Sequence, residues 1–484
     1  MKSLTFTICT LFVIVSISGC QSKNKNASTE SEMERFSGIF QIERDLQDIK
    51  EDGKLTALTS YSSTSYFLYR GQPMGFEYEL LERFADYLDV DLDIRISGSI
   101  DSMMSELNNE EIDLIAHGLT ITTGRKQIVD FTDYLYLTHQ VLVQKKPDNW
   151  RNMGWSEVQS HLIHDAIELI GDTVSVRKNS SYMHRLNNLS KEIGGKIHID
   201  TLPGSLSTSE IIEMVVEGKI KYTIADNNLA SINASYYPIL DIDVPVSFSQ
   251  RIAWAVRPQA DDLQEAANMW LKKIKKDVDY YVIYNKYFKN KRNFRQRIQS
   301  DFYSLNENKI SKYDDIIKTH AGKVGWDWRL LASLVYQESR FKPSASSWAG
   351  AKGLMQIMPA TARELGVQNR SDPVQSIHGG TKYLQQIYDD FHNIEDSLQR
   401  IKFTIASYNC GYYHVQDARK LADMRGLNRN QWDENVEQMI LELSHRRNYN
   451  LPEIEYGYVR GIEPYTYVRQ IFERYDHYKK FISS

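Results

Sequence analysis

The chain has 484 residues, which at about 150 residues per domain corresponds to two or three folding units. Its 42% apolar and 25% charged residues are ordinary for a globular protein, and they exclude a disordered chain and a polytopic membrane protein. Because 58 Lys and Arg stand against 63 Asp and Glu, the formal net charge is −5. This balance argues against a nucleic-acid partner bound through a global basic field.

The first twenty residues predict export and a lipid anchor. Lys2 precedes an apolar stretch, Leu4–Ile17, that is too short to span a membrane. The stretch ends in Ile17-Ser18-Gly19-Cys20, which resembles the lipobox of bacterial lipoproteins, where the signal is cut before a cysteine that becomes lipidated. This resemblance, with Gln21-Ser22 after the cysteine, implies attachment to the periplasmic face of the outer membrane. An ordinary signal peptide with a chance cysteine is the alternative.

The next 240 or so residues alternate between strand-like and helical runs. Lys54–Ser60, Asp91–Ile96 and Ile112–Ala116 have the composition of strands, and Glu77–Leu88 has apolar residues at helical spacing. Such alternation predicts an α/β fold with mostly parallel sheets.

Two segments in this region carry a specific resemblance. They are Gly75-Phe76-Glu77-Tyr78-Glu79-Leu80 and the run from Asp113 to Arg125, continued by Val129-Asp130-Phe131. Together they resemble the periplasmic family 3 solute-binding proteins, which bind amino acids between two lobes, over about residues 50–290. The resemblance implies that Thr120 and Arg125 bind a ligand carboxylate and that Asp226 binds its amino group.

The residue types suit those roles. Arg125 offers a carboxylate two parallel N–H donors, which a lysine cannot do. Asp226 ends the apolar run Tyr222–Asp226. The alternatives are that Arg125 is a solvated charge and that Asp226 is a helix N-cap.

One segment departs from the family pattern. The second lobe of the family has a Gly-rich turn that approaches the ligand carboxylate, whereas this chain reads Arg177-Lys178-Asn179-Ser180-Ser181. Side chains in place of glycines predict a less close backbone approach. A ligand larger than one amino acid, such as a muropeptide or another wall peptide, is therefore possible.

The last 170 or so residues have helical spacing and contain a candidate general acid. Asp327 is predicted to cap a helix, and Glu338 follows Val335 of the buried stripe by one turn. A carboxyl group in apolar surroundings stays protonated near neutral pH, as a general acid requires. Pairing of Glu338 with Arg340 or Lys342 at the edge of the core is the alternative.

Ordered motifs surround this glutamate. They are Glu338-Ser339, Gly353-Leu354-Met355-Gln356, Ser407-Tyr408-Asn409-Cys410-Gly411 and residues 462–468. They resemble the motifs of the soluble lytic transglycosylase family, which has an α-helical lysozyme-like fold. The resemblance implies that Glu338 is the catalytic group. By motif position it implies substrate contacts by Ser347, Met355, Gln356, Tyr408, Asn409 and Tyr467.

The resemblance also implies a reaction that uses one carboxyl group. Glu338 would protonate the glycosidic oxygen between N-acetylmuramic acid and N-acetylglucosamine in peptidoglycan glycan strands. It would then take a proton from the 6-hydroxyl of the same muramoyl residue, which closes onto C1 as a 1,6-anhydro end. Ordinary glycosidases need two carboxylates, and these motifs supply one. No water is consumed, and no metal or cofactor is needed.

The order of these parts resembles the layout of the membrane-bound lytic murein transglycosylase F family. A lysozyme-type hydrolase and a non-catalytic binding lipoprotein are the alternatives, and a Cys410–His414 nucleophile is a remote one. The predicted parts are a signal peptide (1–19), a lipidated N-terminus and tether (20–49), a two-lobed solute-binding domain (50–290), a linker (291–312) and a lysozyme-like catalytic domain (313–484).

Overall fold

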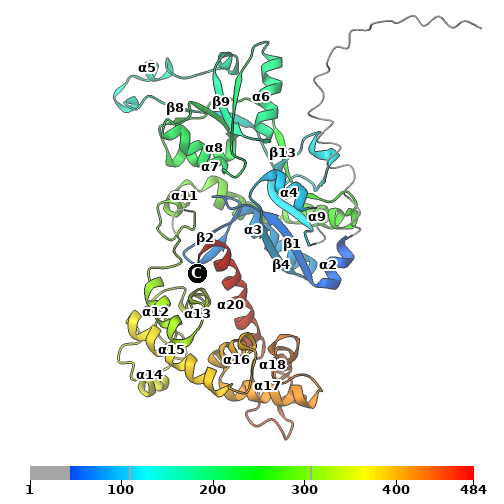
Figure 1. Cartoon of the computed structure of the whole chain (residues 1–484), viewed down its shortest axis with the longest axis vertical. Helices are drawn as coiled ribbons and strands as arrows, with labels where there is room; N and C mark the ends of the chain where they lie inside the picture. The colour runs from blue at the N-terminus through cyan, green and yellow to red at the C-terminus, as the bar shows by residue number, and fades with distance from the viewer. Residues whose placement is uncertain (1–43, 108–110, 306–307, 484) are drawn as a thin grey trace, which may run out of the picture. The chain divides into compact units, whose positions relative to one another are not determined.

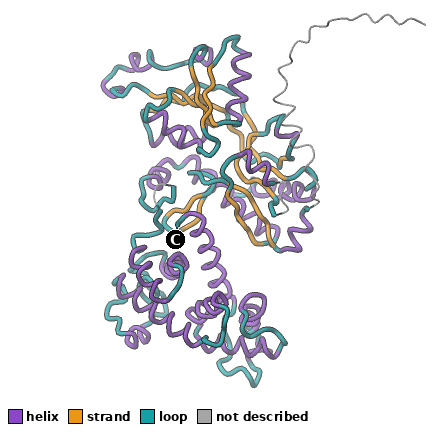
Figure 2. The backbone as a smooth tube through the Cα atoms, viewed as in Figure 1, coloured by secondary structure: helices purple, strands orange, loops and turns teal. Residues whose placement is uncertain are grey.

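The computed structural model describes residues 44–107, 111–305 and 308–483. The predicted signal peptide, Cys20 and most of the predicted tether lie outside the described residues. All named strands end by Val256, and the part after it is built from helices and loops (Figures 1 and 2). None of the helices in the described ranges has the length and apolar character needed to span a bilayer.

The first lobe is an α/β unit around a mixed sheet with strand order β4-β1-β5-β13-β6. Its core includes the stacked rings of Trp254 and Trp270, whose centroids are 5.7 Å apart, and the buried Phe84 of α3. The lobe comprises strands β1 (Lys54–Thr59), β2 (Phe67–Tyr69), β3 (Gln72–Met74), β4 (Asp91–Ile96), β5 (Leu114–Thr120), β6 (Asp130–Phe131), β7 (Tyr136–Thr138) and β13 (Gln250–Val256), and helices α2 (Leu46–Asp52), α3 (Phe76–Leu88), α4 (Ile100–Glu106), α9 (Asp261–Ile274) and α10 (Val278–Tyr284).

The second lobe has two small sheets, of order β11-β8-β12 and β10-β9. One apolar cluster of this lobe contains Leu142 and Ile224, and a second cluster contains Val143 and Ala225. Because neighbouring residues of a strand point to opposite faces, both faces of β8 and β11 are buried. The lobe comprises β8 (Gln140–Lys145), β9 (Thr173–Arg177), β10 (His198–Leu202), β11 (Tyr222–Asp226), β12 (Leu240–Asp241), α5 (Trp155–Gln159), α6 (Ser181–Glu192), α7 (Thr208–Val216) and α8 (Asn227–Tyr236).

The prediction of mostly parallel sheets is wrong. Strand β1 is parallel to β4 and β5, and β9 is parallel to β10, but β13 is antiparallel to β5, β6 and β7. Strand β8 is also antiparallel to β11 and β12. The reason is that β13 returns to the first lobe after the chain has built the second, and hydrophobic alternation does not encode the direction of such a returning strand.

The C-terminal domain is helical. Asp327 accepts a hydrogen bond from the Arg329 backbone N–H at 2.9 Å, which confirms it as the N-cap of the helix that contains Glu338. Leu331, Leu334 and Val335 of that helix are fully buried. The domain comprises α12 (Asp314–Val324), α13 (Trp328–Ser339), α14 (Pro359–Leu365), α15 (Pro373–Asp390), α16 (Ser397–Cys410), α17 (Tyr412–Met424), α18 (Glu437–Glu442), α19 (Arg446–Tyr449) and α20 (Ile462–Phe481).

The β2–β3 hairpin of the first lobe packs against the helical domain. Leu68 of β2 is fully buried within the apolar cluster of that domain. At the hairpin turn, the Tyr478 O–H of α20 donates to the Gly71 carbonyl at 2.7 Å. Gly71 has φ +75°, and a Cβ there would lie 2.7 Å from both Tyr478 and Phe341. The turn therefore requires glycine for its conformation and for its close fit.

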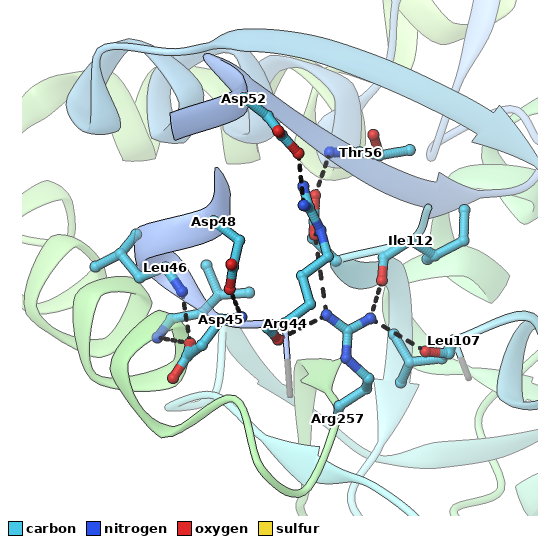
Figure 3. Close-up of polar contacts among 11 residues, drawn as sticks. Arg44, Asp45, Leu46, Asp48, Asp52, Thr56, Leu107, Ile112 and Arg257 are labelled. Carbon is cyan, nitrogen blue, oxygen red and sulfur yellow. Dashed lines mark hydrogen bonds and ion pairs between the residues drawn. The ribbon is translucent and has the colours of Figure 1, made fainter. Parts of the chain in front are cut away.

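The segment before β1 is fastened to the first lobe by a buried ionic network (Figure 3). Arg44 Nε donates to Asp113 Oδ1 at 2.8 Å, and Arg257 Nη2 donates to the Arg44 carbonyl at 2.9 Å. Asp45 accepts the Leu263 backbone N–H at 2.8 Å, at the start of α9. The packed lobe therefore begins earlier than residue 50. Within the predicted linker, α11 (Lys291–Ile298) is helical.

Candidate active site and ligand cleft

Glu338 lies in the last turn of α13, at the negative end of the helix dipole. The helix ends because Arg340 and Phe341 adopt left-handed backbone angles, with φ of 51° and 58°. The side chain of Glu338 is partly buried. Burial and the helix end therefore both disfavour the charged carboxylate.

Tyr467 of α20 is the hydrogen-bond partner of Glu338. Its O–H donates to Glu338 Oε1, and the tyrosine is itself buried. Burial raises the pKa of Glu338 to about 7, and the hydrogen bond from Tyr467 acts in the opposite direction. Near neutral pH both forms of Glu338 are accessible, which suits a group that gives and then retakes a proton. Among the described residues, no ion pair joins Glu338 to Arg340 or Lys342, so that alternative is wrong.

Tyr408 and Met355 lie beside this pair. The Tyr408 O–H donates to the Met355 carbonyl at 2.6 Å, and Met355 is fully buried. Burial, followed by the nearby charge of Glu338, raises the pKa of Tyr408. The structure therefore brings together Glu338, Tyr408 and Tyr467, from α13, α16 and α20.

The loop between α13 and α14 contains Ser347 and Gln356. Ser347 is exposed, and its Oγ accepts the Ala351 backbone N–H at 3.0 Å. Gln356 has φ +46°, and its Nε2 donates to the Ala345 and Gly353 carbonyls at 3.0 and 2.9 Å. The amide of Gln356 therefore stabilises the loop through two backbone carbonyls, whereas the motif implied a contact with the sugar.

Two further motif residues, Asn409 and Cys410, lie at the end of α16. Asn409 is exposed at the end of α16, and no hydrogen bond joins it to Glu338 in the described part of the chain. Cys410 is next to it, and burial raises the pKa of this thiol to about 12. Burial therefore favours the protonated thiol at neutral pH, which argues against a Cys410–His414 nucleophile.

The two lobes enclose a cavity of about 230 Å³ that is lined by Thr120, Arg125 and Asp226. Arg125 Nη1 donates to the Thr120 carbonyl at 3.0 Å. Burial, and then the nearby charge of Arg177, lowers the pKa of Arg125 to about 10, so the group remains charged at neutral pH. Arg125 is thus a partly buried cation that lines the cavity, not a solvated charge.

Asp226 is buried at the end of β11, and its Oδ1 has no hydrogen-bond partner among the residues that the structure describes. It stands at the N-cap position of α8, as the alternative predicted, but within the described part of the chain its side chain makes no capping hydrogen bond. Burial raises the pKa of Asp226 to about 7. A ligand ammonium group would satisfy Oδ1 and favour the ionised carboxylate.

The second-lobe turn contains a non-glycine residue in the left-handed conformation. Asn179 adopts φ +57°, a left-handed conformation that asparagine tolerates better than most residues, so the glycine-like backbone is retained. Arg177 lines the cavity, which the sequence did not predict because the comparison of the turn concerned only the lost glycines.

Hydrogen bonds also connect the two lobes. They join Ser63 to Ser209 at 3.0 Å, Asn179 to Asp101 at 2.5 Å, and Thr120 to Ser181 at 3.3 Å.

Comparison with known proteins covers both parts of the chain. Residues 54–290 match the model of bacterial extracellular solute-binding proteins, family 3, and residues 315–430 match the transglycosylase SLT domain. The solved structure of an ancestral arginine-binding protein bound to arginine is 25% identical, with a TM-score of 0.41, and the match covers 49% of this chain and 98% of that one.

Relatives match most of the chain. A membrane-bound lytic murein transglycosylase F from Desulfosudis oleivorans is 35% identical over 431 residues, which are 89% of this chain and 91% of that protein. A protein of the same name from Stutzerimonas stutzeri is 34% identical over 438 residues, which are 89% of this chain and 86% of that protein. With both domains matched in this order over nearly the whole length, the chain belongs to the membrane-bound lytic murein transglycosylase F family.

Proposed function

We propose that the C-terminal domain cleaves the β-1,4 bond between N-acetylmuramic acid and N-acetylglucosamine in peptidoglycan without water, leaving 1,6-anhydromuramoyl ends. The observation that carries this proposal is the partly buried Glu338 with a pKa of about 7, held by the hydrogen bond from Tyr467. Family membership supports the same activity, because the matched relatives are named lytic murein transglycosylases.

The chemistry follows from the two forms of Glu338. The protonated form donates to the glycosidic oxygen as the bond to C1 breaks, while the substrate's own N-acetyl group stabilises the developing charge. The resulting carboxylate accepts the proton of the muramoyl 6-hydroxyl, whose oxygen bonds to C1. Tyr467 stabilises the carboxylate between these steps, since its O–H donates to Oε1.

A lysozyme-type hydrolase is the competing function. Such enzymes place a second carboxylate about 5–9.5 Å from the acid. The names of the matched relatives, lytic murein transglycosylases, favour the single-carboxyl reaction.

The product distinguishes the two reactions. Peptidoglycan digested by the chain from residue 21 onward, which keeps every described residue, is expected to yield 1,6-anhydromuramoyl products. Each is lighter by one water than its hydrolytic counterpart because an internal hydroxyl replaces the solvent nucleophile. Mass spectrometry measures the difference, and a digest containing reducing ends alone would favour the hydrolase.

Other motif residues have proposed supporting roles. Ser347 accepts a backbone N–H, so its own hydroxyl proton remains to polarise the N-acetyl group. Asn409 is exposed and offers its amide to a sugar. Gln356 acts mainly by holding the loop, while Met355 and Tyr408 form the wall beside Glu338.

The two-lobed domain is proposed to bind a wall-derived ligand with carboxylate and amino groups. Arg125 and Thr120 would bind the carboxylate, and Asp226, with its unpartnered Oδ1, would bind the ammonium group. We expect Arg125→Ala to weaken binding of a wall peptide by about 1.5–3 kcal/mol, the value of a hydrogen bond to a charged group. Calorimetry measures this, and equal binding by the variant would contradict the assignment.

Helix α20 contacts both Glu338 and the first lobe, so it could connect ligand binding in the cleft with the catalytic site. Its first half holds Tyr467 against Glu338, and its last turns hold Tyr478 against Gly71 of the first lobe. A ligand changes turnover only if it binds one arrangement of these contacts more tightly than another. Turnover measured across ligand saturation tests this. An unchanged rate would leave the two-lobed domain as a positioning module.

The chain is proposed to be anchored to the outer membrane through a lipid on Cys20, facing the periplasm. The relatives' name, membrane-bound, supports membrane association. We expect Cys20→Ala to block lipidation and to move the protein into the soluble periplasmic fraction, because the preceding apolar stretch is too short to span a bilayer. Fractionation and fatty-acid labelling measure this, and label retained by the variant would contradict the anchor.

A further inference from the structure

Two guanidinium groups, one from each lobe, line the cavity between the lobes. Arg125 follows β5 of the first lobe, and Arg177 ends β9 of the second. Both side chains are partly buried. Among the described residues neither forms an ion pair with a carboxylate. Burial lowers the pKa of both groups, and the nearby charges of Asp101 and Asp226 act in the opposite direction without direct contact. The cavity therefore has two nearby cations that lack direct partners of opposite charge.

Within the described ranges, most of their hydrogen-bond donors also have no acceptor. Arg125 Nη1 donates to the Thr120 carbonyl at 3.0 Å, and Arg177 Nη1 donates to the Leu206 carbonyl at 3.4 Å. Each guanidinium has five N–H donors, and a carboxylate accepts two of them in parallel. Each arginine can therefore bind its own carboxylate while it keeps its present contact.

The acidic groups of the cavity are not equivalent. Glu77 uses both oxygens within the first lobe, since Oε1 accepts the Gly118 N–H at 2.9 Å and Oε2 accepts Trp254 Nε1–H at 2.6 Å. Asp226 keeps a buried Oδ1 without a partner. His117 adds no cation, because burial lowers its pKa to about 3. Two cations and one available carboxylate remain to face a ligand.

We infer that this cleft selects an amino-dicarboxylate, with one carboxylate on Arg125, a second on Arg177 and the ammonium group on Asp226. The inference rests on the proposed ligand-binding role of the cleft and names the ligand class. The cavity has a volume of about 230 Å³, which leaves room for one such residue, free or at the end of a wall peptide. Arg177 is the specificity-determining residue for the second carboxylate.

Two pairs of probes isolate that carboxylate. Glutamate and glutamine differ in the charge of one group, and 2,6-diaminopimelate and lysine differ by one carboxylate. Calorimetry with the chain from residue 21 onward is expected to give at least tenfold tighter binding for the dicarboxylate of each pair. Equal affinities within both pairs would overturn the inference, although binding of the monocarboxylates would still support the ligand cleft.

Variants assign the preference to a residue. Arg177→Gln is expected to remove the preference within each pair while glutamine and lysine still bind, which also shows that the variant is folded. Arg125→Gln is expected to weaken all four probes. Lys178→Gln is the matched control, because Lys178 is exposed on the same turn and does not line the cavity. A preference that survives Arg177→Gln, or that disappears in Lys178→Gln, would overturn the assignment.

Failure of the inference and failure of the proposed function are distinguishable. If none of the four probes binds, the inference is wrong. Binding of intact wall peptides would then decide separately whether the cleft has any ligand role. Cleavage of peptidoglycan by Glu338 is measured independently of either result.

Discussion

Glu338→Gln is expected to reduce peptidoglycan cleavage by about 10²–10⁴-fold, the range attributed to a general acid–base group. Glutamine has nearly the same shape, so it can occupy the same place beside Tyr467, but it can neither donate nor retake the proton. Release of soluble fragments from purified peptidoglycan measures cleavage, and cosedimentation with peptidoglycan measures binding. We expect binding to be largely unchanged.

Glu463→Gln provides a matched control for this variant. Glu463 is an exposed glutamate at the start of α20, paired with Arg460 at 2.8 Å, and it lies within the same motif segment as Tyr467. Its substitution is expected to leave cleavage nearly unchanged, because a surface ion pair contributes little. Cleavage by Glu338→Gln within tenfold of the unaltered chain would contradict the assignment of the acid.

The raised pKa of Glu338 also determines how cleavage and stability depend on pH. Because the acid must be protonated, cleavage is expected to decrease as pH rises through about 7. The unfolded chain has its glutamates near pKa 4.3. Between pH values of about 4.3 and 7, Glu338 is protonated in the folded chain but ionised in the unfolded chain. The free energy of unfolding is therefore expected to decrease as pH rises through this window. The Glu338→Gln variant has no titrating group at this position, so this decrease in the free energy of unfolding is expected to disappear.

Gly353→Ala is expected to cause a large loss of both stability and cleavage. Gly353 has φ +89°, and a Cβ there would lie 1.8 Å from the Arg370 carbonyl oxygen, which is backbone and cannot rotate away. The left-handed conformation costs about 1–2 kcal/mol for a residue with a Cβ, and relief of the overlap adds about 1–3 kcal/mol or more. The displaced loop contains Met355 and Gln356, so cleavage should fall as well. Urea denaturation measures the change in unfolding free energy.

Gly350→Ala separates the two costs. Gly350 has the same φ of +89°, but the nearest atom to its Cβ would be Pro359 Cγ at 3.9 Å. We expect this variant to show the conformational cost alone, with much smaller effects on stability and cleavage. Equal effects of the two substitutions would show that the contact with Arg370 does not matter.

Local sequence patterns predicted the elements that hold the chemistry. The helix that contains Glu338, its cap at Asp327 and the strand that ends in Asp226 were all predictable, because capping and hydrophobic spacing are properties of neighbouring residues. The motifs indicated both domains, and the family comparison confirms them.

Long-range contacts could not be predicted in the same way. The hydrogen bond from Tyr467 to Glu338 joins residues 129 positions apart. The residues around Arg177 in the sequence do not indicate a binding role. Its place in the cavity depends on how the two lobes are brought together. The direction of β13 likewise depends on how the chain returns from the second lobe. In each case the deciding neighbour is distant in sequence, so composition and periodicity contain no signal for it.

The β2–β3 hairpin affects how the chain unfolds. Leu68 belongs to the apolar cluster of the helical domain, and Phe481 of α20 packs against the clusters of both that domain and the first lobe. The second lobe has separate clusters. The first lobe and the helical domain should therefore melt as one cooperative unit, with the second lobe as another. A cut after residue 290 would expose apolar surface on both fragments, so the evolutionary modules and the cooperative folding units of this chain have different boundaries.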